Sequence, residues 1–189
     1  MSRTKNTLQL IVLVIIFLTI SITLGSISSE TLLGYIGSDN AFILIFILGI
    51  IGGLTTFTGI PYHLVLMSLA AGGINPIGLG ICTALGVMLG DSTMFLLSKK
   101  AKTVLSANVI NKITNVTNYI NRHPKLLNPF LILYGTLSPF SNDFIVASLG
   151  IMGYRYRQII IPLTIGNIFY NIAIAYLGYY TYDVIINLF

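Results

Sequence analysis

The chain has 189 residues, of which 55% are hydrophobic and only 8% are charged. Its mean hydropathy of +0.90 is typical of a polytopic membrane protein and excludes an ordinary soluble domain. The net charge of +5 indicates orientation in a membrane rather than nucleic-acid binding, because the basic residues flank apolar segments. Cys82 is the sole cysteine, which excludes an internal disulfide. Since no polar linker divides the chain, we predict one membrane domain over residues 1–189.

The hydrophobic pattern predicts an all-α integral membrane protein with spanning helices, two opposed re-entrant helical hairpins in inverted repeat and one interfacial helix. A spanning helix needs about 20 apolar residues, and an interfacial helix shows apolar positions three and four apart. The expected elements are a spanning helix at 8–24, a first re-entrant hairpin at 41–73, a spanning helix at 77–98, an interfacial amphipathic helix at 104–122, a second re-entrant hairpin at 129–153 and a spanning helix at 158–180. The stretch 25–40 between the first two is read as a polar connection.

The two predicted hairpins share a proline in the middle of an apolar segment, at Pro61 and Pro139. A proline removes a backbone donor, and irregular backbone inside a bilayer persists only where protein or water covers it. A glycine follows each proline by eleven residues, at Gly72 and Gly150. We interpret the two segments as an inverted pair of hairpins whose tips meet near the midplane. Two kinked spanning helices are the alternative.

Charge distribution favours the hairpins. If both segments turn back on the side they entered, all ten basic residues fall on one side of the membrane. Glu30, Asp39 and Asp183 then fall on the other. By the positive-inside rule, the N-terminus and the basic loops are cytoplasmic and the protein lies in the cell membrane.

Polar residues near the two tips and in the last span are the candidate substrate contacts. Each proline is expected to start a short helix, whose free amides and positive dipole end suit an anion. The candidates are Pro61, His63, Thr136, Ser138, Pro139, Asn142, Asp143, Asn167 and Asn171. Asn167 and Asn171 share one helical face, where they either line a path or bond between helices.

Three ionisable residues are candidates for proton or cation coupling: Asp91, Asp143 and His63. Acids inside a membrane are costly and commonly functional, and histidine titrates near neutral pH. The structural alternatives are a hydrogen-bonded Asp91 near the helix end and a neutral buried His63. No Ser/His/Asp set, metal-ligand spacing or phosphate loop is visible, so we expect no enzyme, no metal and no cofactor.

Three motifs resemble the DedA/VTT family of membrane proteins, once labelled SNARE-associated. They are Ile60-Pro61 leading to Ala70-Ala71-Gly72, the stretch GVMLGDSTMFLLSK at 86–99, and Tyr134–Gly150 followed by AYLGYY at 175–180. Together the matches extend over roughly residues 57–180, which is most of the chain. Bacterial members carry arginines on both sides of the second proline, where this chain has Thr136 and Asn142, and His63 stands where the family has an acid.

The resemblance implies a lipid translocase, a flippase or scramblase that moves a phospholipid or polyprenyl-phosphate headgroup through a polar cleft between two re-entrant loops. Without the arginine pair, helix amides and the side chains of Thr136, Ser138 and Asn142 remain to bind the headgroup. The alternatives are a proton- or cation-coupled transporter of a small polar solute and a non-transporting membrane scaffold. Expected partners are membrane lipids, protons or cations and a second copy in a homo-oligomer, but no nucleic acid.

Overall fold

The computed structural model describes Thr19 and residues 29–38, 40–54, 62–101, 124–138 and 141–186. These residues form helices and turns, with no β-strand among them, so the all-α fold class is confirmed. The elements are α2 (Ser29–Ile36), α3 (Ala41–Gly52), α5 (Tyr62–Ala71), α6 (Pro76–Ala101), the 3₁₀ turn η1 (Pro124–Leu126), α8 (Leu127–Leu137), α9 (Asp143–Ile151) and α10 (Tyr156–Ile186). Of the predicted elements, the helix at 104–122 lies outside the described residues, as does 8–24 apart from Thr19.

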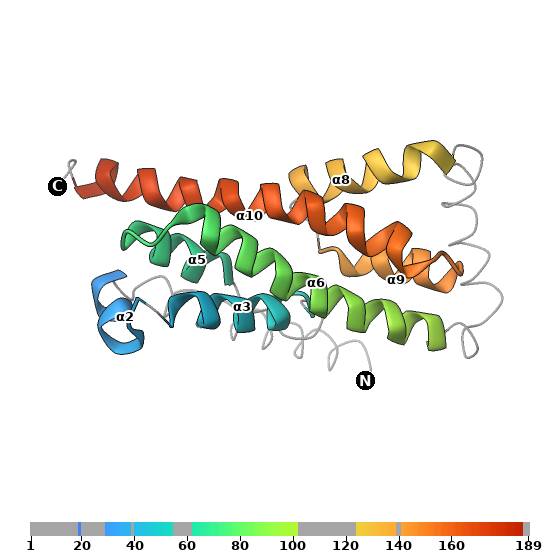
Figure 1. Ribbon diagram of the computed structural model, residues 1–189, viewed down its shortest axis with the longest axis horizontal. Helices are drawn as coiled ribbons and strands as arrows, with labels where there is room; N and C mark the ends of the chain where they lie inside the picture. Colours follow the sequence, from blue (N-terminus) through green and yellow to red (C-terminus); the bar gives the residue numbers. More distant parts are fainter. Residues whose placement is uncertain are drawn as a thin grey trace, which may run out of the picture.

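Two long helices form the frame of the molecule (Figure 1). Helix α6 has 26 residues and α10 has 31, and both are long and apolar enough to cross a membrane. They contain the residues 77–98 and 158–180 for which we predict spans. Asn75 caps α6, because its side-chain oxygen accepts hydrogen bonds from the backbone of Ile77 (2.9 Å) and Gly78 (3.2 Å).

Large apolar side chains on the outer faces of both long helices are exposed at intervals of about one turn. On α6 these are Ile77, Ile81, Leu85, Leu89 and Leu96, and on α10 they are Ile161, Ile165, Phe169 and Leu177. A soluble protein rarely exposes continuous apolar stripes of this kind. Exposed stripes on two helices of spanning length are the surface that lipid tails require.

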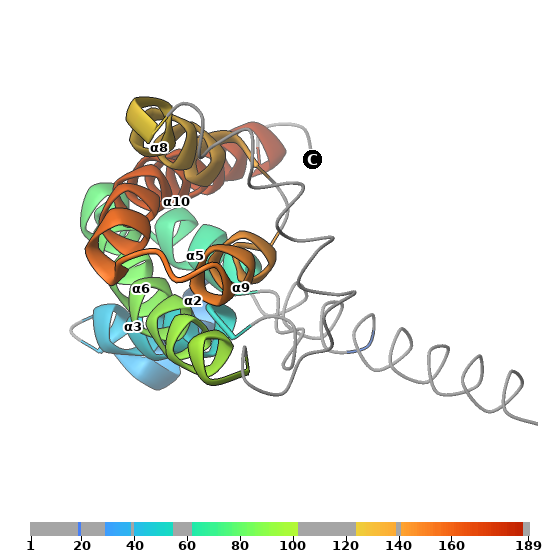
Figure 2. The same ribbon diagram turned by 90° about the vertical axis from the view of Figure 1, so that its right-hand side faces the viewer.

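Among the described residues, four shorter helices pack on the two long helices in two pairs, and α2 lies against α5. Helix α3 packs on α6 and α5 on α10, whereas α8 packs on α10 and α9 on α6. The pair α3 and α5 lies along one half of the long helices, and the pair α8 and α9 lies along the other half (Figure 1). Figure 2 shows the bundle from one end. In this view α9 lies in front of α5, α3 lies beside α6, and α8 lies beside α10.

The second helix of each pair ends in the same turn. After α5, the backbone N–H of Ile74 donates to Leu69 O (3.3 Å), and after α9 that of Tyr154 donates to Leu149 O (3.2 Å). The glycine inside each turn is left-handed, with φ of 87° at Gly73 and 86° at Gly153. These bonds and glycines define the Schellman helix ending. The structural match therefore pairs Gly73 with Gly153, not Gly72 with Gly150 as the proline spacing predicts.

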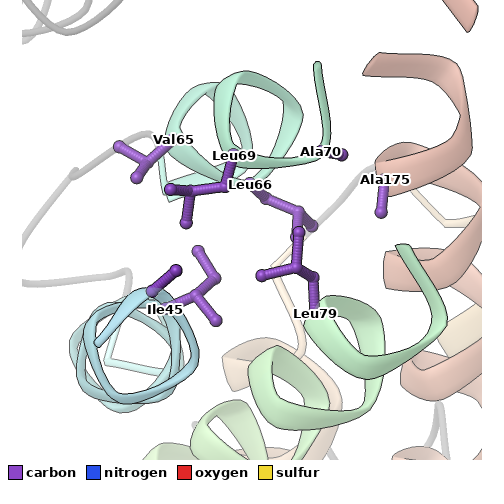
Figure 3. Packing of buried hydrophobic residues seen from close by; sticks show 8 residues of the cluster. Ile45, Val65, Leu66, Leu69, Ala70, Leu79 and Ala175 are labelled. Carbon is purple, nitrogen blue, oxygen red and sulfur yellow. The ribbon is translucent and has the colours of Figure 1, made fainter. Parts of the chain in front are cut away.

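Each pair of short helices has its own apolar core with the long helices. The first contains Ile45 of α3, Leu66 and Leu69 of α5, Leu79 of α6 and Ala175 of α10. These side chains point toward one another in Figure 3. The second core lies in the other half and joins residues of α6, α8, α9 and α10: Phe95, Leu127, Leu131, Val146, Leu149, Ile159, Ile160 and Leu163.

Two local expectations are wrong. Helix α9 begins at Asp143 rather than at Pro139, and Ser138 closes the end of α8 by donating its backbone N–H to Tyr134 O (2.8 Å). The hydroxyl of Ser141 instead accepts the N–H of Asp143 (3.2 Å) at the start of α9. Helix α2 is the second difference, because it lies in the stretch read as a polar connection.

Candidate functional site

A partly open cavity of about 240 Å³ lies where the two pairs of short helices come together. The first half of the described chain lines it with Gly52, Gly53, Tyr62, His63, Val87 and Asp91. The second half lines it with Gly135, Ser138, Ser141, Asn142, Asn167 and Tyr170. Because residues of the middle of both α6 and α10 take part, the cavity lies between the two apolar cores rather than at either end.

Asn142 joins the two long helices at this cavity. Its side-chain NH₂ donates to Asp91 Oδ2 of α6 (3.1 Å) and to Asn167 Oδ1 of α10 (3.2 Å). Asp91 and Asn167 are 2% and 4% exposed, so these bonds satisfy polar groups that water scarcely reaches. The start of α9 therefore holds α6 and α10 together through one amide.

Asp91 retains bonding capacity that faces the cavity. Its second carboxylate oxygen, Oδ1, is buried and has no hydrogen-bond partner in the part of the chain that the structure describes. A buried carboxylate without a second partner is costly, because an ionised oxygen normally accepts more than one hydrogen bond. The side-chain Nδ2 of Asn167 is likewise buried without a partner among the described residues, so Asp91 and Asn167 are the side chains of this site best placed to bind a ligand.

Asp143 lies beside the cavity and not on its wall. It is 2% exposed and accepts a hydrogen bond from the Ser141 hydroxyl (3.0 Å). The Tyr134 hydroxyl donates to the backbone oxygen of Ser141 (3.2 Å) and so fixes the same segment. Asp143 adds a second carboxyl next to Asn142 and Asp91, and it helps to shape the start of α9.

Aromatic rings form one wall of the cavity. The rings of Tyr62 and His63 have centroids 3.9 Å apart, and the ring of Tyr170 meets His63 edge-on at 5.5 Å. His63 Nε2 is buried without a hydrogen-bond partner among the described residues. The part of the cavity lined by Tyr62, His63 and Tyr170 is therefore aromatic, with His63 in contact with both tyrosines.

The structure brings most of the sequence-predicted site residues together, but not all. His63, Ser138, Asn142, Asn167 and Asp91 line the cavity. Two other predicted contacts lie elsewhere. Thr136 donates to the backbone oxygens of Ile132 within α8 (2.8 Å) and of Gly166 in α10 (3.4 Å), and Asn171 donates to Asn167 O within α10 (2.8 Å). Pro61 and Pro139 lie outside the described residues.

Sequence reasoning missed three polar lining residues: Tyr62, Ser141 and Tyr170. Tyr170 follows Asn167 by three positions, so the shared helical face could have placed it. Tyr62 and Ser141 carry no comparable signal. Within the described residues there is no group of three or more His, Cys, Asp or Glu side chains that could hold a metal ion.

Two helices long and apolar enough to cross a membrane, with a cavity partly lined by polar side chains at mid-length, are typical of a helical membrane protein. The model of the VTT domain matches residues 60–180, which are more than half of the chain. The chain belongs to this family, the DedA/SNARE-associated family, as the motifs indicated. No curated protein and no solved structure matches the chain.

Proposed function

We propose that this protein is a membrane lipid translocase, a flippase or scramblase, and not an enzyme. The headgroup of a phospholipid or polyprenyl phosphate enters the cavity, while its acyl or prenyl tail stays among the lipids outside. One observation carries the proposal: a cavity of about 240 Å³, lined in part by the polar side chains of Asp91, Asn142 and Asn167, lies at mid-length of two helices whose outer faces are apolar. Since a water molecule occupies about 30 Å³ of liquid, the cavity suits a headgroup and excludes a whole lipid.

The arrangement of the short helices supports a re-entrant reading of both pairs. Helices α3, α5, α8 and α9 have 12, 10, 11 and 9 residues, fewer than the roughly 20 that a span needs. Each pair lies along one half of α6 and α10, and the second helix of each pair ends in the same turn (Figure 1). We propose that each pair enters and leaves by one membrane face, so that the two tips meet at the cavity.

The described basic residues support an orientation. Lys99 and Lys100 end α6, Lys125 precedes α8, and Arg155 and Arg157 lie at the start of α10. These positions share one end of the bundle in Figure 1. We propose that this end faces the cytoplasm, in accordance with the positive-inside rule.

Lipid transfer in proteoliposomes tests the proposal. Vesicles that contain the protein and a fluorescent lipid are treated with dithionite, which bleaches only the outer leaflet. In protein-free vesicles dithionite bleaches the outer half of the fluorescent lipid. With the protein present, we expect it to bleach well over half, because lipid from the inner leaflet reaches the outer one. Bleaching limited to that half, with a protein that remains folded, would refute lipid transfer.

A small polar solute is the second candidate substrate, and one observation favours it: two buried acids lie at or beside the cavity. Buried acids are typical of proton- or cation-coupled transport. Uptake of a solute into the same vesicles under a pH or sodium gradient, without dithionite access to inner-leaflet lipid, would favour this alternative. We further propose that membrane lipids are the partners of this chain.

A further inference from the structure

We infer that the basic end of the bundle carries a separate lipid site, which binds the phosphate of an acidic phospholipid in the leaflet at that end. The site lies on the outside of the molecule, apart from the cavity. It consists of Lys99 of α6 together with Arg155 and Arg157 beside the start of α10. The inference requires that the protein spans a membrane, but not that it transfers lipid.

Two aromatic side chains connect these cations across two helices. Tyr156 stands between the two arginines in the chain, and its hydroxyl forms a hydrogen bond (2.7 Å) with Ser92 Oγ of α6. The ring of Tyr156 meets the buried ring of Phe95 edge-on, with 5.7 Å between the centroids. Lys99 Nζ lies 5.7 Å from the centre of the same Phe95 ring. One packed pair of rings therefore links the lysine to the two arginines.

The described part of this end contains no acid that could neutralise the three cations, whose side chains are exposed. No aspartate or glutamate occurs between residues 92 and 142 or between 144 and 182. Asp91 and Asp143 are buried at mid-length, and Glu30 belongs to α2 at the opposite end of the bundle (Figure 1). Exposed cations without acids attract an anion from outside the chain, and arginine forms paired hydrogen bonds with phosphate.

Depth in the membrane identifies this anion as a lipid phosphate. Exposed apolar side chains run along α6 from Ile77 to Leu97, and at 1.5 Å per residue this run is about 30 Å long. Because the hydrocarbon core has the same thickness, Lys99 falls at the level of the headgroups. On α10, Arg157 precedes the exposed Ile161 by one turn and has the equivalent place. A phosphate bound here leaves its acyl chains along the exposed apolar stripes.

A tryptophan reporter measures which lipid lies beside this end. The chain contains no tryptophan, so a single one reports its own surroundings. Leu96→Trp places it one turn from Lys99, and Ile77→Trp places it at the opposite end of the same helix, where it serves as the control. Both positions are exposed to lipid, at 58% and 46%. The proteins are reconstituted with phosphatidylcholine and phosphatidylglycerol, one of which carries brominated acyl chains that quench tryptophan on contact.

We expect phosphatidylglycerol to bind at least about fivefold more strongly than phosphatidylcholine beside Leu96→Trp, the factor that one basic residue near an acidic headgroup supplies. Beside Ile77→Trp we expect no preference. High salt should lower the preference at Leu96→Trp without any further substitution, because it screens exposed charges. Equal binding of the two lipids at Leu96→Trp, or the same preference at both ends of α6, would overturn the inference.

Neutral variants assign the preference to the three cations. In the Leu96→Trp protein, Lys99→Gln, Arg155→Gln and Arg157→Gln together should remove it. Lys125→Gln is the matched control, because Lys125 is an exposed cation before α8 that stands outside the ring-linked cluster, and it should keep the preference. A preference that survives the triple variant with the protein folded, or that Lys125→Gln removes as well, would contradict the assignment.

Two soluble competitors separate the lipid from other anions. Inorganic phosphate and polyglutamate are each added at the ionic strength of a sodium chloride control, and neither should lower the preference further than chloride does. A larger loss with phosphate would assign the site to the free ion, and a larger loss with polyglutamate would assign it to an acidic protein segment. Either result would overturn the lipid as ligand. Since quenching reports binding at the outer face, its failure leaves lipid transfer intact, and failed transfer leaves this site intact.

Discussion

The two halves of the molecule share a scaffold but differ in what they bring to the cavity. In both halves a short helix packs on the long helix that follows it, and its companion ends in a turn with a left-handed glycine. The tip of the first half contributes the rings of Tyr62 and His63. The tip of the second half contributes Ser138, Ser141 and Asn142.

The shared helices and turns are needed for folding, whereas the side chains that differ between the two halves are needed for the cavity. Equivalent positions in the two scaffolds should respond alike to mutation, because the same packing is lost in each. Positions at the two tips should respond differently, because among the described residues the hydrogen bonds of Asn142 tie the second tip to α6 and α10.

Alanine at the helix crossings should give the largest loss of stability, and equally in both halves. A Cβ at Gly86 would lie 3.0 Å from Gly49 Cα of α3, and one at Gly166 would lie 2.9 Å from Gly135 Cα of α8. Since backbone cannot move aside like a side chain, we expect Gly86→Ala and Gly166→Ala each to lower the free energy of unfolding by about 3 kcal/mol. Chemical denaturation in detergent measures this. Gly34→Ala is the control, because nothing lies within 4 Å of its Cβ.

At the tips, Asn142→Leu should destabilise the protein and His63→Phe should not. Leucine leaves Asp91 Oδ2 and Asn167 Oδ1 without the donor that Asn142 provides, which costs about 2 kcal/mol for buried acceptors. Phenylalanine keeps the ring contacts of His63, whose Nε2 has no partner among the described residues, so a change under about 0.5 kcal/mol is expected. Equal melting of the two variants would contradict the difference between the tips.

Alanine in the two turns should cost about 1 kcal/mol each, because a left-handed conformation is unfavourable for residues with a Cβ. The positions are Gly73 and Gly153, with φ of 87° and 86° and open space around the added carbon. The free energies of unfolding of Gly73→Ala and Gly153→Ala should agree closely. Unequal losses would show that the two turns are not equivalent in the folded protein.

Thr136→Val should have the smallest effect, although Thr136 lies on the same segment as Ser138. Its hydroxyl bonds to backbone oxygens within α8 and of α10 and does not line the cavity. We expect a change under about 0.5 kcal/mol in stability, as for most substitutions that leave packing intact, and an unchanged rate of lipid transfer. A clearly reduced transfer rate with unchanged stability would place Thr136 in the site after all.

Much of the fold could be predicted from sequence, because hydrophobic length and proline position report directly on helices in a membrane. The predicted segments 77–98 and 158–180 lie within α6 and α10. The start of α9 could not be placed, because two local signals compete. Proline at a first helical position suggests Pro139, but the hydroxyl of Ser141 accepts the N–H of Asp143 and the helix begins there.

The candidate site could be predicted only in part. A polar residue in an apolar segment is visible in the sequence, but the direction in which its side chain points is not. Asp91, Asn142 and Asn167 stood out as polar residues in apolar segments, and they bond to one another. Thr136 stood out in the same way, yet its hydroxyl is used in helix packing. In the sequence, Tyr62 resembles any aromatic residue of a membrane helix. Its place in the site is visible only from the packing of its ring against His63.

Thiol accessibility tests the central claim, a water-filled polar cavity at mid-length of α6, most directly. In a Cys82→Ser background, cysteine is placed at Ser138, which lines the cavity and is half-buried, or at Leu89, which is 42% exposed on the outer apolar face. The protein is reconstituted in vesicles and treated with a water-soluble, charged thiol reagent. We expect Ser138→Cys to react and Leu89→Cys not to react, because the reagent follows water and not lipid. An unreactive Ser138→Cys beside a reactive Leu89→Cys would contradict a water-filled cavity.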